Sequence, residues 1–268
     1  MQVDFRRPTN PLLSDLIEGY YFLQEQEPGK QFGYYTFPNN FFILSVLENA
    51  GVTVNNNQVD CRPTSFPCFR SNLTCSYMEP LFIRYHGTVN ELSIYFKPLG
   101  IYAFLPFQLL RHSMPAFSDF IPFDDYEQQM TTILRQSDRN EQVRLLEEYW
   151  LSKKTLEVDP ESSRLLKEIE SGRGISEIAE QLGISRQYLN RIFLSRLGKT
   201  PTAYRKIQRF RNAVNSNTKV RNLTELGYDS MYYDQSHFIR SVKELTSLSP
   251  KGFFDKIEAK EGNVWLYV

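Results

Sequence analysis

Two similar segments follow one another in the C-terminal part of the chain, and this duplication constrains the fold more than any other feature. The segments span residues 175–201 and 223–250. When they are aligned, Leu189 corresponds to Phe238, Arg191 to Arg240, and Pro201 to Pro250. Each segment has the pattern of a short helix, a tight turn and a longer helix, which together form a helix-turn-helix. The duplication therefore predicts an all-α domain over residues 156–268 that contains two such units.

The turns and helix starts of this region carry local signals of their own. Gly183 lies where the turn of the first unit requires a residue that tolerates a positive φ angle. Thr200-Pro201 and Ser249-Pro250 each combine a side chain that caps a helix N-terminus with a proline in the first turn. Asp159-Pro160 predicts a similar start for the first helix of the domain.

The longer helix of each unit is predicted to have an apolar face and an opposite polar face. Leu189 and Phe193 fall on the apolar face of the first unit, and Phe238 and Val242 on that of the second. The polar faces carry arginine, asparagine and glutamine, which form paired hydrogen bonds with guanine or adenine in the DNA major groove. The candidates for base contacts are Gln187, Asn190, Arg191, Gln235, Ser236 and Arg240.

The charge of the chain is zero overall but unevenly distributed. Residues 1–155 contain 13 basic and 17 acidic side chains, a balance of −4, whereas residues 156–268 contain 18 and 14, a balance of +4. No acidic residue occurs from Gln181 to Thr224. Surface helices usually mix both signs, so this stretch indicates a site for a polyanion such as DNA. A basic surface without a partner is the alternative.

Residues 1–155 are predicted to form a mixed α+β domain that binds an effector or mediates dimerisation. Aromatic and β-branched runs separated by turn residues predict strands over 31–37, 41–47, 51–54, 81–86 and 91–96. Helical spacing of apolar residues predicts helices over 11–22, 101–110, 126–135 and 140–152. The last helix has Val143, Leu146, Tyr149 and Trp150 on one face, which is expected to pack on its own domain or, alternatively, against a second subunit.

The strands of this domain are rich in aromatic residues. At strand spacing such residues usually form core, and the lining of an apolar pocket for a small-molecule effector is the less favoured alternative. The residues concerned are Tyr34, Tyr35, Phe41, Phe42, Tyr85 and Tyr95.

No motif of a catalytic or cofactor site occurs in the sequence. Nucleophile-elbow, phosphate-loop and dinucleotide-binding patterns are absent, and His86 and His112 lack the spacing of metal ligands. We therefore expect no enzyme activity, no metal and no cofactor. Cys61, Cys68 and Cys75 fit neither a disulfide framework nor a zinc site and indicate reduced thiols. With no long apolar run and no signal peptide, the protein is expected in the cytoplasm and away from membranes.

Over roughly residues 160–258 the sequence resembles the DNA-binding domain of the AraC/XylS family of bacterial transcription regulators. The resemblance rests on LGIS, YLNRIF and GKTP in the first unit, and on YYDQSHFIR and SLSP in the second. Tyr204, Arg209 and Ala213 match the family on the helix that connects the two units. The N-terminal part is more weakly similar to a sensor domain of some members, through PLLSDLIEGYYFL, YYTFPNNFFIL and ELSIYFKPLGIYAFL.

The resemblance implies a regulator in which a helix from about Pro201 to Asn215 holds two recognition helices. These would enter successive major grooves about 34 Å apart, with base contacts from the six polar residues given above. The implied partners are double-stranded DNA and RNA polymerase, while a small-molecule effector and a homodimer stay open. Six residues are expected at backbone phosphates, four by the resemblance and Lys199 and Arg205 by their charge: Arg186, Lys199, Thr200, Arg205, Lys243 and Ser249.

The second unit departs from the family pattern at several positions. We expect it to be less stable than the first unit and to contribute less to base specificity, because core truncation and a glycine inside a helix both destabilise. The departures are Met231 in place of the turn glycine, Gly227 for a core alanine, Ser230 for an apolar residue, Val242 for an aromatic residue and Ser247 for a glycine.

Three other functions compete with a regulator. An adaptor whose second unit has decayed would bind no specific DNA sequence. A sensor enzyme with an attached DNA-binding module would need a convergent polar pocket within residues 1–155. An alkylation-repair protein of the Ada type requires a four-cysteine zinc site, which three cysteines cannot form, and is excluded.

Overall fold

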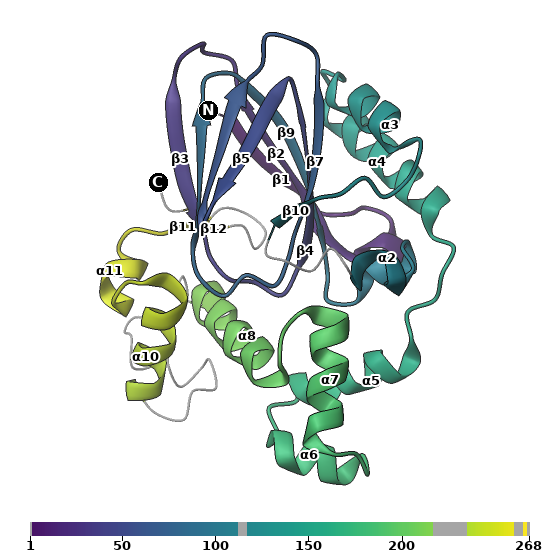
Figure 1. Cartoon of the computed structure of the whole chain (residues 1–268), viewed down its shortest axis with the longest axis vertical. Coiled ribbons are helices and arrows are strands. Elements are labelled where there is room, and N and C mark those ends of the chain that lie inside the picture. The colour runs from purple at the N-terminus through teal and green to yellow at the C-terminus, as the bar shows by residue number, and fades with distance from the viewer. Residues whose placement is uncertain (1, 112–116, 217–234, 260–264, 267–268) are drawn as a thin grey trace.

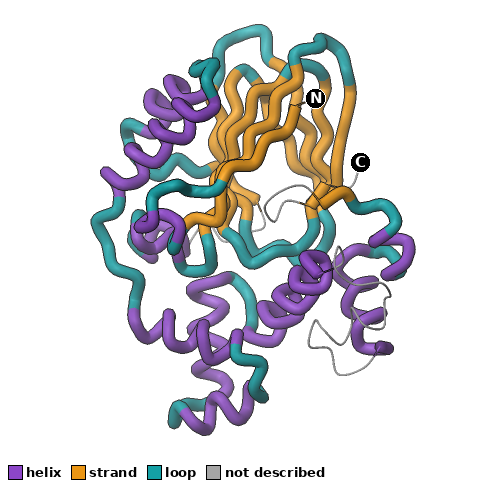
Figure 2. The backbone as a smooth tube through the Cα atoms, turned by 180° about the vertical axis from the view of Figure 1, so that it is seen from behind, coloured by secondary structure: helices purple, strands orange, loops and turns teal. Residues whose placement is uncertain are grey.

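Two β-sheets, whose strands are mostly antiparallel, face each other in the N-terminal part of the molecule (Figures 1 and 2). The computed structural model describes residues 2–111, 117–216, 235–259 and 265–266. The six-stranded sheet has the order β1 (Gln2–Arg6), β2 (Ile17–Glu25), β9 (Val89–Phe96), β4 (Phe42–Glu48), β7 (Phe69–Thr74) and β10 (Phe117–Asp119). The four-stranded sheet has the order β3 (Gln31–Thr36), β8 (Leu81–His86), β6 (Gln58–Pro63) and β5 (Ala50–Asn55), with β6 and β8 parallel.

Alternation along the strands divides the six-stranded sheet into two faces. On β9, Leu92 and Ile94 belong to a hydrophobic cluster beneath the helices. Glu91, Ser93 and Tyr95 point the other way, into the space between the two sheets. Both faces of this sheet are therefore buried, but they have different chemistry, apolar towards the helices and partly polar towards the second sheet.

Helices cover the apolar face of the six-stranded sheet (Figure 1). They are α1 (Pro11–Ser14), the 3₁₀ helix η1 (Gly100–Ala103), α2 (Phe107–Arg111), α3 (Tyr126–Leu134) and α4 (Arg139–Lys153). Leu146 and Trp150 of α4 are fully buried, and the Trp150 ring meets Phe96 of β9 edge-on at a centroid distance of 4.9 Å. The apolar face of α4 thus packs on its own domain, which confirms the favoured interpretation over a subunit contact.

The predicted helix over residues 11–22 is largely wrong. Asn10 caps a helix that begins at Pro11, but α1 ends at Ser14 and strand β2 begins at Ile17. The run from Tyr20 to Leu23 is buried on both sides, so it has no polar face to distinguish strand from helix by periodicity. Strands β1, β6, β7 and β10 were also not predicted, whereas the five predicted strands and the helices corresponding to α3 and α4 are confirmed.

The C-terminal part is helical. It consists of α5 (Pro160–Glu170), α6 (Ile175–Gln181), α7 (Arg186–Leu197), α8 (Pro201–Ser216), α10 (Gln235–Thr246) and α11 (Pro250–Phe254), followed by two short paired strands, β11 (Glu258–Ala259) and β12 (Trp265–Leu266). The fold is therefore a β-rich N-terminal region followed by a helical region, as predicted. Within the described residues, no helix combines the length and the apolar character needed to cross a membrane.

The helical region is packed directly against the N-terminal region. The Tyr102 hydroxyl donates to the carbonyl of Arg196 at 2.6 Å, and the Asn40 amide donates to the carbonyl of Tyr204 at 3.1 Å. One hydrophobic cluster extends from the six-stranded sheet to Leu189 and Phe193 of α7. Because this core is continuous, the division of the chain at residue 155 stays a prediction.

Candidate nucleic-acid interface

The first helix-turn-helix unit has the local geometry that its sequence predicts. Helix α6 ends at Gln181, and Gly183 adopts a φ angle of +65° in the turn. The Ser185 hydroxyl then accepts a hydrogen bond from the Tyr188 amide at 3.1 Å and caps α7. Gly198, with φ of +65°, ends α7. The turn and both helix ends are therefore fixed by residues next to them in the sequence.

The polar face of α7 is open to solvent. Leu189 and Phe193 are buried in the core, as predicted, which turns Gln187 and Arg191 outward. Asn190 is half-buried. The Arg191 guanidinium lies 5.0 Å from the centre of the Tyr188 ring, a cation–π contact that holds the side chain along the helix. These three side chains are accessible to a ligand, and their contacts with bases stay predictions.

Helix α10 presents a similar face. Its apolar side chains, including Phe238 and Val242, are fully buried, and its exposed side carries Gln235, Ser236 and Arg240. The shorter helix and the turn of this unit fall in residues 217–234, so the departures at Gly227, Ser230 and Met231 lie outside the described residues. The described part of the second unit is therefore its longer helix, α10.

The ends of α7 and α10 differ in one respect that bears on stability. Gly198 ends α7, and Ser247 occupies the corresponding left-handed conformation after α10, with φ of +60°. Their amides make equivalent hydrogen bonds, to Leu194 at 3.0 Å and to Lys243 at 2.8 Å. A residue with a Cβ in this conformation costs about 1 kcal/mol relative to glycine. This cost agrees with the expectation that the second unit is the less stable one.

Four of the six expected phosphate contacts lie at accessible positions. Arg186 and Lys243 are exposed on α7 and α10. Thr200 and Ser249 cap the next helices, with their hydroxyls accepting the amides of Ala203 at 3.2 Å and Gly252 at 3.1 Å. Amides at a helix start attract anions, so both positions suit a phosphate.

The phosphate role expected for Lys199 and Arg205 stays a prediction, and in this conformation both side chains are buried. Lys199 is 4% exposed, and burial is the main cause that lowers its pKa to about 8, opposed by the nearby Cys75 thiol. Arg205 is 8% exposed and donates to the carbonyls of Ile169 and Arg173. Charge alone suggested a surface role, but in this conformation both side chains are inside the molecule.

Arg205 is instead a cap for the end of α5. Its Nε and Nη2 donate to the carbonyl of Ile169 at 3.0 and 2.8 Å, and its Nη1 donates to the carbonyl of Arg173 at 2.6 Å. We expect Arg205→Ala to lower the free energy of unfolding by about 2 kcal/mol, because it removes two donors from the buried carbonyl of Ile169. Urea denaturation measures this loss. The slope of DNA affinity against salt should stay unchanged, and a flattened slope would restore the phosphate role.

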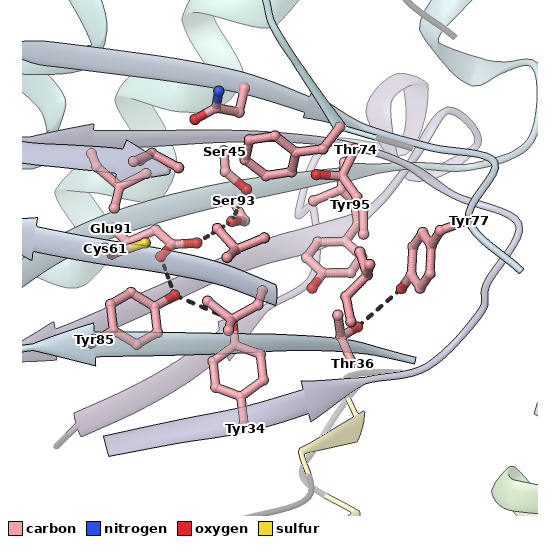
Figure 3. A pocket seen from close by; sticks show the side chains of 18 residues that line it. Tyr34, Thr36, Ser45, Cys61, Thr74, Tyr77, Tyr85, Glu91, Ser93 and Tyr95 are labelled. Carbon is pink, nitrogen blue, oxygen red and sulfur yellow. Dashed lines mark hydrogen bonds between the residues drawn. The ribbon is translucent and has the colours of Figure 1, made fainter. Parts of the chain in front are cut away.

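A second candidate site is a cavity of about 50 Å³ between the two sheets (Figure 3). Tyr34, Tyr85 and Tyr95 line it, whereas Phe42 is ordinary core and Tyr35 is exposed. Some of the aromatic residues therefore line a cavity, and others belong to the hydrophobic core. Polar lining residues such as Glu91 were not predicted. The sequence signal that could have identified them is the alternation of polar and apolar residues along a strand whose apolar positions predict burial.

Comparisons with known proteins agree with the helical architecture. Residues 178–256 match the family model described as a helix-turn-helix domain. The C-terminal part of the chain therefore contains a helix-turn-helix domain of the AraC type, a class found in DNA-binding transcription regulators. A comparison with curated protein sequences finds no match.

Solved structures of ToxT from Vibrio cholerae have a similar chain path. One crystal form is 12% identical, with a TM-score of 0.45, and the match covers 87% of this chain and 98% of that one. Wild-type ToxT with a bound unsaturated fatty acid is 11% identical, with a TM-score of 0.43, and the match covers 87% of this chain and 94% of that one.

Proposed function

We propose that this protein is a sequence-specific DNA-binding transcription regulator whose helices α7 and α10 enter successive major grooves. The accessible polar face of α7, on a helix-turn-helix unit with intact caps and turn, is the observation that carries the proposal. Gln187, Asn190 and Arg191 supply the side chains for base contacts from this helix. The matching contacts from α10 come from Gln235, Ser236 and Arg240.

The position of α8 supports the use of both units. This helix has 16 residues, a length of about 24 Å, and it contacts both α7 and α10 (Figure 1). A rigid connection of this kind favours two half-sites at a fixed spacing of about one helical turn of DNA. Phosphate contacts from Arg186, Thr200, Lys243 and Ser249 would then set the register on the duplex.

The rest of the proposal concerns the N-terminal region. We propose that it binds a small-molecule effector in the cavity between its sheets and that it transmits binding to the helical region through their shared core. A homodimer, recruitment of RNA polymerase and a cytoplasmic location belong to the same proposal. No part of it requires a catalytic group.

Selection from a random duplex-DNA library tests the proposal. Two half-sites about one helical turn apart support the use of both recognition helices. One half-site restricts base contacts to the first unit. The absence of enrichment, with weak and steeply salt-dependent binding, contradicts the proposal and favours the adaptor.

Single substitutions on the selected duplex then assign the base contacts. Arg191→Ala is expected to weaken binding by about 1–3 kcal/mol and to relax the base preference at one position, because it removes a paired contact to guanine. Arg240→Ala should cost less, in line with the less stable second unit. Titration by fluorescence anisotropy measures both, with Arg62→Ala as a control on the exposed side of β6. Equal losses from Arg191→Ala and Arg240→Ala would show that the second unit contributes fully.

A further inference from the structure

The space between the two sheets is unusually polar for the interior of a β-sandwich, whose facing sides normally supply an apolar core. Ser93 of β9 pairs with Ser45 of β4, and Ser45 pairs with Asn72 of β7, so the three form one row across the six-stranded sheet. All three line the cavity, and the Ser45 and Ser93 hydroxyls are 2.6 Å apart (Figure 3). The two serines have hydrogen-bond partners within the protein, whereas Asn72 Oδ1 has none among the described residues.

Glu91 is the central group of the cavity. It is 6% exposed, and its carboxylate accepts hydrogen bonds from the Tyr85 hydroxyl at 2.5 Å and from the Ser93 hydroxyl at 2.9 Å (Figure 3). Among the described residues that line the cavity, none is lysine, arginine or histidine. Burial consequently raises the pKa of Glu91, and the two hydrogen bonds only partly offset this. A carboxylate buried without a counter-charge is costly, so the site favours a ligand that brings one.

Asn72 supplies a second acceptor. Its Nδ2 donates to Oδ1 of Asp119 at 2.8 Å, and because an ionised carboxylate only accepts hydrogen bonds, this contact fixes the orientation of the amide. Asn72 is 1% exposed, and its Oδ1 has no donor among the described residues. The cavity thus presents two acceptors, Glu91 and Asn72, that call for donors on a ligand.

The remaining wall is aromatic. Tyr34, Tyr85 and Tyr95 line the cavity from β3, β8 and β9, and Tyr77 and Phe117 add two further rings. Aromatic rings attract organic cations through their quadrupole and pack well against alkyl groups. A carboxylate, an amide oxygen and aromatic rings together form a set suited to an ammonium group with a short apolar tail.

We propose that the cavity between the two sheets binds a small organic ammonium compound, with the Glu91 carboxylate as its counter-charge and Asn72 Oδ1 as a second acceptor. The proposal names the ligand class of the effector site and rests on the proposed function only for its effect on DNA binding. An anionic ligand is disfavoured, because it would meet the Glu91 carboxylate, and the buried Arg211, whose charge partly offsets the rise that burial causes in the pKa values of Tyr77 and Tyr95, does not itself line the cavity. The volume of about 50 Å³ limits the ligand to a few heavy atoms, since one water occupies about 10–15 Å³ on the same measure.

One wall of the cavity also connects the ligand site with the helical region. Tyr77 lines the cavity, and its hydroxyl donates to the carbonyl of Phe37 at 2.8 Å. The Phe37 ring belongs to the hydrophobic cluster that contains Phe238 and Val242 of α10. A ligand that shifts Tyr77 would therefore act on the packing of the second helix-turn-helix unit.

Three probes of equal length but different charge test the ligand class on the full chain: butylammonium, butanol and butyrate. Isothermal titration calorimetry should detect butylammonium, with butanol weaker and butyrate not bound. Glu91→Gln keeps the shape of the side chain and removes its charge, so it should weaken butylammonium binding by about tenfold or more. Glu127→Gln, which is exposed on α3, is the matched control and should leave binding unchanged.

Other outcomes overturn the proposal. Butyrate binding as tightly as butylammonium, or none of the three probes binding, would show that the cavity does not select a cation. Unchanged butylammonium affinity in Glu91→Gln would place the ligand elsewhere. The wild-type comparison of the three probes decides the question even where Glu91→Gln does not fold. Binding of the DNA selected above, measured with and without butylammonium, separates the two proposals, since the cation site and the DNA site each succeed or fail in their own assay.

Discussion

Phe37→Ala is expected to lower the free energy of unfolding by about 3–5 kcal/mol, although Phe37 lies in the N-terminal region and the loss falls on the helical one. Phe37 follows β3 and is 1% exposed. Its ring meets that of Phe253 edge-on at a centroid distance of 5.0 Å, inside the cluster that contains Ile207 and Phe210 of α8. Truncation would leave a cavity in the only described core of the second helix-turn-helix unit.

Urea denaturation of the full chain measures this loss. Phe66→Ala is the control, because Phe66 is 65% exposed and its truncation should change stability by less than about 0.5 kcal/mol. The weakened packing of α10 should also reduce the contribution of Arg240 to DNA affinity. A loss below about 1 kcal/mol for Phe37→Ala would mean that the second unit is stable without the N-terminal region, and it would remove the connection from the cavity to α10.

The helix-turn-helix units could be predicted in detail because their signals are local. The Ser185 cap, the Gly183 turn and the spacing of Leu189 and Phe193 all lie within a few residues of the structure that they determine. A helix face that is determined by such local signals can be predicted without knowing which other element packs against the helix. The same reasoning predicted that the face of α10 opposite the buried Phe238 is exposed.

Features that depend on distant parts of the chain could not be predicted in the same way. Strand β2 has apolar residues at both helical and strand spacing, and its pairing with β1 and β9 selects the strand. The cavity depends on strands from both sheets, so no single segment indicates that Glu91 and Asn72 face the same space. Arg205 is buried because α5 and the residues after it fold over it, which its charge does not reveal.

Lys199 illustrates this limit and leads to the second large prediction. It follows the C-terminal end of α7, in the stretch without acidic residues, and was expected at a phosphate. The neighbouring backbone is held against the N-terminal region, where the Ser76 hydroxyl donates to the carbonyl of Leu197 at 3.2 Å. Cys75, the residue before Ser76, lies close enough to Lys199 to influence its pKa. The burial of Lys199 therefore reports contact between the two regions.

Lys199→Met is expected to raise the free energy of unfolding at pH 7 by up to about 3 kcal/mol. Burial lowers the pKa of Lys199 from 10.5 to about 8, so at pH 7 the folded protein bears the cost of a buried ammonium, and a pKa difference of this size corresponds to about 3 kcal/mol. Between about pH 8 and 10.5 Lys199 binds more protons in the unfolded chain than in the folded one, so its own contribution to stability rises with pH and the difference between Lys199→Met and the wild type should narrow. Methionine fills a similar volume without a charge, and the variant should lack this rise.

Urea denaturation of both proteins from pH 7 to about 9.5 measures the difference, a window that stays below the ordinary pKa of tyrosine. Lys167→Met is the control, because Lys167 is exposed on α5 and its replacement should leave the pH dependence unchanged. If Lys199→Met instead destabilises the protein at pH 7, the ammonium group makes favourable contacts that outweigh the cost of its burial in the free energy of unfolding. Unchanged stability with a loss of DNA affinity would mean that the two regions separate on DNA, which would expose Lys199 to a phosphate.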